Sequence, residues 1–133
     1  MKIVRLLDSF ALIKYFEAEP GGDRIRQYFD QAHRHQETLL ICELNVGEVF
    51  YIIARKHGLS RAEEILTTLS TLPLKTIPVS WEVVLKAARL KAQHALSYAD
   101  CIAAACAMNH QAVLLTGDPE FRAVKHLLRI EWV

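Results

Sequence analysis

Four carboxylic acids from distant parts of this sequence have the types and positions that metal chemistry requires: Asp8, Glu48, Asp100 and Asp118. A cluster of carboxylates without histidine or cysteine suits Mg²⁺ or Mn²⁺, because these hard cations prefer oxygen ligands and keep several waters. Such a cation lowers the pKa of a bound water and neutralises charge that develops on a phosphate. If the four acids meet in space, the chemistry they predict is therefore hydrolysis of a phosphodiester bond.

The elements that must position these acids follow from the alternation of short apolar runs with helical stretches along the chain. This alternation predicts an α/β fold, a three-layer α/β/α sandwich with a mostly parallel central sheet. Strands are expected at residues 3–7, 39–42, 76–79 and 112–115 and near 129–133, and helices at 9–17, 23–35, 44–57, 60–72, 81–93 and 98–109. Ser60 and Glu63 have capping-box spacing, so we expect Ser60 to cap the fourth helix.

The predicted order of elements brings the four acids to one edge of the sheet. Asp8 directly follows the first strand, and Asp118 lies just beyond the strand at 112–115. Glu48 lies early in the helix that leaves the second strand, so it begins at the same carboxyl edge. The helix containing Asp100 must deliver the chain to the amino end of the strand at 112–115, so its start also lies at that edge. Ligands of such sheets bind outside the carboxyl ends of the strands.

Each acid taken alone also has an ordinary structural explanation. Asp118 precedes a proline, which makes it a good helix N-cap. Asp100 occupies the third position of a capping box, and Asp8 could simply favour the dipole of the helix that follows it. Glu48 could face solvent. These alternatives stay open for any single residue.

The surroundings favour a metal for two of the four acids. Glu48 and Asp100 are each the only charge in an apolar run of nine residues. A lone carboxylate on a largely buried helix is costly unless it is paired or binds a metal. No Lys or Arg within either run offers a partner, so a divalent cation is the better compensation. Ser9 and Thr116, beside two of the acids, are predicted to hydrogen-bond the carboxylates and orient them.

The bulk composition limits the function classes. The 133 residues fit one domain spanning 1–133, and 52% hydrophobic with 23% charged residues indicates a folded globule. The N-terminus lacks the apolar core of a signal peptide, and no window has the roughly 18 apolar residues of a membrane span, so we expect a cytoplasmic protein without membrane association. Three cysteines match neither a disulfide framework nor a zinc pattern. A net charge of +1 predicts that any contact with nucleic acid is local.

The segments around the four acids resemble the PIN-domain family and, within it, the VapC-type toxins of bacterial and archaeal toxin–antitoxin pairs. The resemblance covers essentially the whole chain and rests on four motifs: LLDSFALI at 6–13, NVGEVFY at 45–51, LSYADCIAAA at 96–105 and LLTGDPEF at 114–121. Each motif is weak alone, but their order, spacing and total length together are specific.

This resemblance implies a Mg²⁺- or Mn²⁺-dependent endoribonuclease that cuts RNA. It also implies a homodimer that is inhibited by a cognate antitoxin protein. By motif position, the metal would be held by the four acids: Asp8, Glu48, Asp100 and Asp118. Thr116 would support them. The chain departs from the family pattern at Phe10, where a small polar residue is common, and at Gly117, where a larger or basic residue is common. The first departure is expected to alter the edge of the pocket, and the second to remove a substrate contact.

Several alternatives and details stay open at the level of sequence. A catalytically silent PIN-like module that binds RNA or protein would be expected to lack an acid, yet all four are present. A phosphoacceptor domain would need an acid pair with a lysine or an Asp-x-Asp motif, and a flap-type DNA nuclease usually has more acids and a longer chain. The helix at 23–35 and the pair of helices spanning 48–72 have apolar faces that an antitoxin or second subunit could cover, although core packing explains most of these apolar residues. Four basic residues near the acidic edge are candidate RNA contacts: Lys14, Arg55, Arg122 and Lys125. Surface cations of this kind are more often merely solvated.

Overall fold

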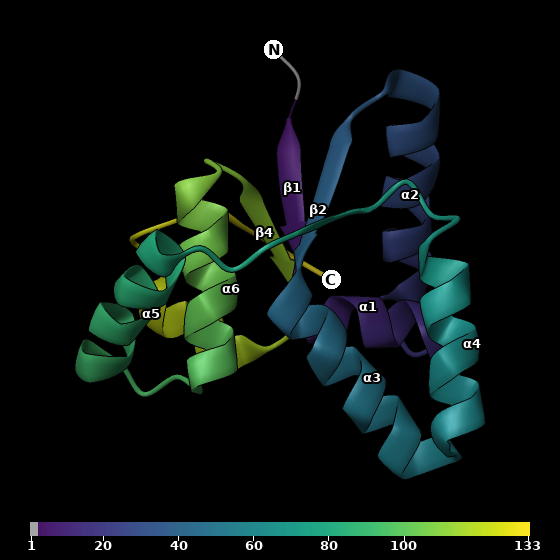
Figure 1. The fold of residues 1–133 in the computed structure, drawn as a ribbon. Helices are drawn as coiled ribbons and strands as arrows, with labels where there is room; N and C mark the ends of the chain where they lie inside the picture. The colour runs from purple at the N-terminus through teal and green to yellow at the C-terminus, as the bar shows by residue number, and fades with distance from the viewer. Residues whose placement is uncertain (1–2) are drawn as a thin grey trace.

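Five short strands form the centre of the fold in the computed structural model, which describes residues 3–133 (Figure 1). The strands are β1 (Val4–Leu7), β2 (Thr38–Cys42), β3 (Lys75–Ile77), β4 (Val113–Thr116) and β5 (Ile130–Trp132). They form one sheet in the order β3-β2-β1-β4-β5, and each neighbouring pair is parallel. The predicted sandwich with its parallel sheet is thus confirmed, and the pairing is parallel throughout rather than mostly so.

Helices cover both faces of this sheet. The helices are α1 (Ser9–Phe16), α2 (Gly22–His35), α3 (Glu43–His57), α4 (Leu59–Leu69), α5 (Trp81–Gln93) and α6 (Tyr98–Asn109), with a 3₁₀ helix at Pro119–Val124. Helices α1 to α4 pack on one face, and α5, α6 and the 3₁₀ helix pack on the other. Within the described residues 3–133, none of the helices combines the length and the apolar character that crossing a lipid bilayer demands.

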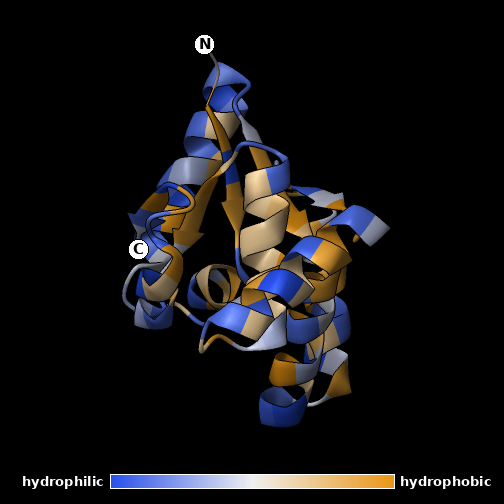
Figure 2. Ribbon diagram, turned by 90° about the vertical axis from the view of Figure 1, so that its left-hand side faces the viewer, coloured by the Kyte–Doolittle hydropathy of each residue, from blue (hydrophilic) through white to orange (hydrophobic). Residues whose placement is uncertain are grey.

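The two cores follow from the alternation of side chains along the strands, because successive residues point to opposite faces. Leu6 and Leu114 pack against α5 and α6, whereas their neighbours Leu7 and Leu115 pack against α1 to α4. The strands are accordingly hydrophobic along most of their length, and the hydrophilic residues lie on the outer helices (Figure 2). Burial on both faces is the usual condition of a parallel sheet.

Most predicted helix starts agree with the structure, and one is wrong. Ser80 and Ser97 cap α5 and α6, their hydroxyls accepting from the backbone N–H groups three residues further on. Ser60 does not cap α4, which begins at Leu59 with Gly58 as its N-cap and no side-chain cap bond. Gly58 has a φ of 95°, which glycine adopts without strain, so the turn from α3 to α4 takes a single residue. Ser60 therefore falls inside the first helical turn, and the helix ends at Leu69 rather than near Leu72.

The order of the strands creates a switch point between β1 and β4. From β1 the chain builds outward to β2 and β3, and it then crosses to β4 on the other side of β1. Open parallel sheets bind ligands in the crevice at the carboxyl ends of the two strands that flank such a point. Asp8 follows β1 directly, and its backbone N–H donates to the Leu115 carbonyl of β4 at 3.3 Å. The residues at this crevice are thus those around Asp8 and the end of β4.

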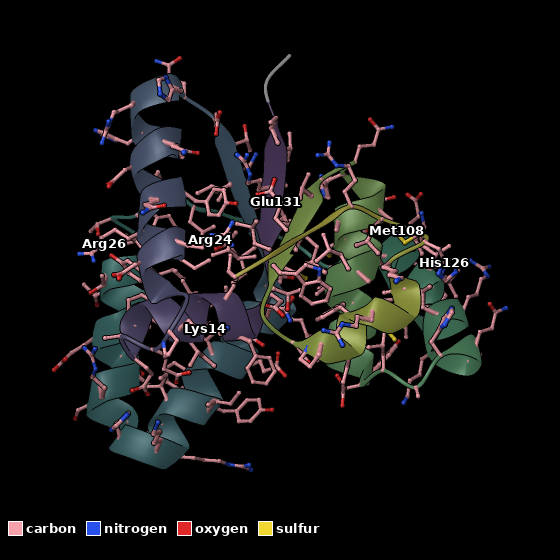
Figure 3. All side chains as sticks on the ribbon, turned by 180° about the vertical axis from the view of Figure 1, so that it is seen from behind. Lys14, Arg24, Arg26, Met108, His126 and Glu131 are labelled. Atoms are coloured by element: carbon pink, nitrogen blue, oxygen red, sulfur yellow. The ribbon has the colours of Figure 1, made fainter. Side chains whose placement is uncertain are left out.

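A buried arginine ties the outer strand β5 to the rest of the sheet. Arg5 of β1 is 8% exposed, and its guanidinium contacts the carboxylates of Glu37 at 2.9 Å and Glu131 at 3.4 Å. The same group lies 4.7 Å from the centre of the Tyr28 ring on α2. Tyr28 donates its hydroxyl to Glu131, and Arg24 of α2 donates to the backbone carbonyl of Trp132, the next residue of β5 (Arg24 and Glu131 are labelled in Figure 3).

Replacing Arg5 by alanine is expected to lower the free energy of unfolding by about 3 kcal/mol, because the two acids lose their buried partner and the ring loses its packing. Urea denaturation measures this change. Arg26→Ala is the matched control, since Arg26 pairs with Asp23 on the surface of α2 and should contribute under about 1 kcal/mol. Equal effects of the two substitutions would show that the Arg5 network does not hold β5.

Candidate active site

Asp8 is held rigidly at the switch point. It is 1% exposed, and it caps α1 through Oδ1, which accepts from the Ala11 N–H at 2.8 Å. Its other oxygen, Oδ2, accepts from the Thr116 hydroxyl at 2.5 Å. Burial raises the pKa of Asp8 to about 7; the hydrogen bonds from Thr116 and Ala11 oppose that rise, and the charges of Asp100 and Asp118 add to it. The Asp8 carboxylate is therefore fixed in place but close to half protonated at neutral pH.

Thr116 links the ends of β1 and β4. Its hydroxyl donates to Asp8 and also accepts from the backbone N–H of Asp118 at 3.0 Å. One buried side chain thus orients the Asp8 carboxylate and holds the backbone of Asp118. Ser9, the other residue expected to orient a carboxylate, is buried at the first position of α1. Its hydroxyl is paired with none of the four acids in the described part of the chain.

Asp100 lies in the first turn of α6, where the Ser97 hydroxyl accepts from its backbone N–H at 3.1 Å. The residue is 5% exposed, and burial raises the pKa of its carboxyl to about 6. Side-chain hydrogen bonding between the Ser97 hydroxyl and the Asp100 carboxyl opposes this rise in pKa, while the negative charges of Asp118, Glu48 and Glu120 add to it. The predicted position at the carboxyl edge of the sheet is thus the observed one, close to the other acids.

Three carboxylates come close enough to share one cation. Asp100, Asp118 and Glu120 each offer an oxygen, and these oxygens lie within 4.8 Å of one another. Asp118 caps the 3₁₀ helix through Oδ1, which accepts from the Glu120 N–H at 2.9 Å. That tight turn brings the Glu120 side chain beside the side chain of Asp118. Sequence reasoning missed Glu120, although its place two residues after Asp118 and directly after Pro119 was the available signal.

Glu48 lies at the margin of this group rather than in it. It is half-buried on α3, and its Oε1 accepts from the Asn45 side-chain amide at 3.3 Å. Its charge acts on Asp100, but its carboxylate is outside the group of three that lies within 4.8 Å. Asn45 is 1% exposed, and its Oδ1 is the one buried side-chain oxygen without a hydrogen-bond partner among residues 3–133. Asn45 therefore orients Glu48 with one atom and leaves a second polar atom unpaired.

The negative charge gathered here is not paired with any basic side chain of the described residues. Within residues 3–133, every ion pair of the structure involves acids other than these five, which are Asp8, Glu48, Asp100, Asp118 and Glu120. Buried carboxylates that crowd together without a counter-ion carry an electrostatic cost, and the raised pKa values of Asp8 and Asp100 express it. A donor set made only of carboxylate oxygens fits Mg²⁺ or Mn²⁺ in both charge and ligand type.

Comparison with known protein families identifies a match that covers most of the chain. The model of the PIN domain family matches residues 5–127, which is most of the chain. None of the curated protein sequences compared with the chain matches it.

Solved structures with the same fold come from several bacteria. VapBC2 from Rickettsia felis, solved with a DNA fragment from its promoter, has a TM-score of 0.77 at 15% identity, covering 97% of this chain and 98% of that one. A toxin–antitoxin complex from Klebsiella pneumoniae has a TM-score of 0.68 at 19% identity, with coverages of 90% and 92%. VapC20 from Mycobacterium tuberculosis, a toxin that cleaves the sarcin–ricin loop, has a TM-score of 0.70 at 12% identity, with coverages of 90% and 94%. At these identities the likeness concerns the fold.

Proposed function

Because the chain belongs to the PIN domain family and gathers unbalanced carboxylates at its switch point, we propose that it is a metal-dependent endoribonuclease and the toxin of a toxin–antitoxin pair. The observation that carries this proposal is the approach of Asp100, Asp118 and Glu120 to within 4.8 Å, with buried Asp8 beside them. A purely structural cluster would be expected to contain a basic partner, because uncompensated buried charge destabilises a fold.

We assign roles to the acids from their positions. Asp100, Asp118 and Glu120 would hold Mg²⁺ or Mn²⁺ directly, together with Asp8, whose oxygens keep lone pairs free beyond their present hydrogen bonds. Glu48, oriented by Asn45, would add negative charge from the opposite helix. The cation would supply a water of lowered pKa and would neutralise charge on the phosphate. Thr116 would keep two acids in register without touching the substrate.

The partner proposed for this toxin is a cognate antitoxin protein, and the similar structures solved as toxin–antitoxin or VapBC complexes support that choice. Helices α3 and α4 project beyond the sheet as a pair (Figure 1) and expose Tyr51, Leu59 and Leu66, so we propose this pair as the surface for the antitoxin or a second subunit. Since cellular RNA is the proposed substrate, the proposal places the protein in the cytoplasm.

A cleavage assay tests the proposed function. Purified protein should cut a labelled structured RNA in the presence of Mg²⁺ or Mn²⁺, and excess EDTA should abolish the cutting because the acids then repel the phosphate. Activity should return when the metal is restored. Glu63→Gln is the matched control, since this acid is exposed on α4 and its loss should leave the rate unchanged. Full activity in EDTA would overturn the metal mechanism, and binding of RNA without any cleavage would support the silent binding module instead.

A further inference from the structure

A hollow of about 250 Å³ opens directly beside the acidic cluster. Its lining comes from α1 and from the segment after β4: Phe10, Lys14, Gly117, Asp118 and Pro119. Asp118 belongs both to this hollow and to the group of three carboxylates. A ligand in this hollow would therefore lie next to the acidic cluster.

Phe10 gives the hollow an aromatic wall. Its side chain is 44% exposed, although the next three residues of α1 are all buried. The fold does not require an aromatic ring at this position, because α1 packs on the sheet through those three residues. Phe10 also lies only two residues after Asp8, so its backbone is fixed by the same N-cap that fixes that acid. A half-exposed ring held in this way is a ready surface for stacking a flat ligand.

Lys14 reaches the hollow because residue 117 has no side chain. A Cβ at Gly117 would overlap the Lys14 Nζ and would lie 2.8 Å from the Val133 carbonyl oxygen. Gly117 has no left-handed backbone that would require glycine, so the glycine serves the close approach of the lysine. The Lys14 Nζ donates to the Val133 carbonyl at 2.9 Å, which leaves two of its three N–H donors for a ligand. Figure 3 shows Lys14 on α1.

We propose that this hollow binds one nucleotide of the RNA substrate next to the scissile phosphate, an inference that rests on the proposed nuclease function. The base stacks on Phe10 and Pro119, and the Lys14 ammonium contacts the adjoining phosphate. Among the described residues, Lys14 is the one cation that lines the hollow, and it offsets the repulsion between the acidic cluster and the RNA backbone. Since a base inside a duplex is not free to stack on a side chain, the subsite selects unpaired RNA.

Binding measurements test this subsite separately from cleavage. Fluorescein-labelled single-stranded RNA of mixed sequence, and the same RNA annealed to its complement, are titrated with protein that carries Asp100→Asn to prevent cutting. Adding Phe10→Ala should weaken binding of the single strand about tenfold, the loss of one stacked base, and should leave duplex binding unchanged. Phe10→Trp should restore binding. Lys14→Met should make the negative slope of log affinity against log salt shallower by about one.

Trp81→Ala is the matched control, because Trp81 is a 72% exposed aromatic that does not line the hollow, and this variant should bind like its parent. Unchanged melting temperatures show that the Phe10 and Lys14 variants still fold. If Phe10→Ala binds the single strand as tightly as its parent does, the proposed subsite is wrong. The same conclusion holds if this variant weakens only the complex with an antitoxin. If the wild-type protein never cleaves RNA but its binding still depends on Phe10, the nuclease proposal fails and the nucleotide subsite stands.

Discussion

Asp100→Asn is expected to lower the rate of RNA cleavage by about a thousandfold and, at the same time, to stabilise the metal-free protein. The loss of rate follows from the position of Asp100, because it is the most buried of the three acids that lie within 4.8 Å. The gain in stability follows from its pKa of about 6, which burial and the charges of Asp118, Glu48 and Glu120 raise above the ordinary value of 3.8. At pH 7.5 the folded protein must therefore keep an unfavourable charge that asparagine does not carry.

The expected gain is on the order of 1–3 kcal/mol in the free energy of unfolding, since each unit of pKa corresponds to about 1.4 kcal/mol. Asparagine keeps the backbone bond to Ser97, so the start of α6 stays capped. Single-turnover cleavage with Mg²⁺ gives the first effect, and thermal unfolding in EDTA gives the second. A variant that is less stable than the wild type in EDTA would contradict the electrostatic account. A variant that keeps its full rate would remove Asp100 from the proposed site.

The strand ends made the position of the acids predictable from sequence. Asp8 and Asp118 follow apolar runs that could only be buried parallel strands, and the connections between such strands fix which edge they reach. The same logic placed Asp100 at the start of α6, because that helix must return the chain to the amino end of β4. These inferences need the order and approximate length of the elements but no distance between side chains.

The sequence does not reveal features that depend on the exact distances between side chains. Glu120 joins the group because a 3₁₀ turn, rather than an α-helical one, follows Asp118. The carboxylates of Asp8 and Glu48 lie outside that group of three, and the metal-binding role predicted for both residues stays a prediction. From the sequence, Gly117 predicts the loss of a substrate contact. In the structure, the absence of a Cβ at this residue leaves space for the side chain of Lys14, which comes from α1. A one-dimensional pattern cannot show that one residue fills the space left by another.

The affinity for Mg²⁺ is expected to fall about a thousandfold between pH 8 and pH 5. Metal binding requires deprotonated carboxylates, and the pKa is about 7 for Asp8 and about 6 for Asp100. At pH 5 the metal must displace a proton from Asp8, which lowers the affinity about a hundredfold, and a proton from Asp100, which lowers it about tenfold. At pH 8 both acids are already mostly ionised. Isothermal titration calorimetry at the two pH values measures the change, and Asp8→Asn should remove most of it.

The same protons give the metal-free protein an unusual pH profile. Asp8 in the folded state keeps its proton up to about pH 7, whereas in the unfolded chain it loses it near its ordinary pKa of 3.8, so the folded state binds more protons between these values. Its contribution to the free energy of unfolding therefore decreases as pH rises through this window, by an amount on the order of 4 kcal/mol. In EDTA the wild type should lose more stability from pH 5 to pH 8 than Asp8→Asn does, and Mg²⁺ should stabilise it most at pH 8. Equal profiles for the two proteins would mean that the Asp8 carboxylate is already balanced, and a cation would then have no electrostatic reason to bind there.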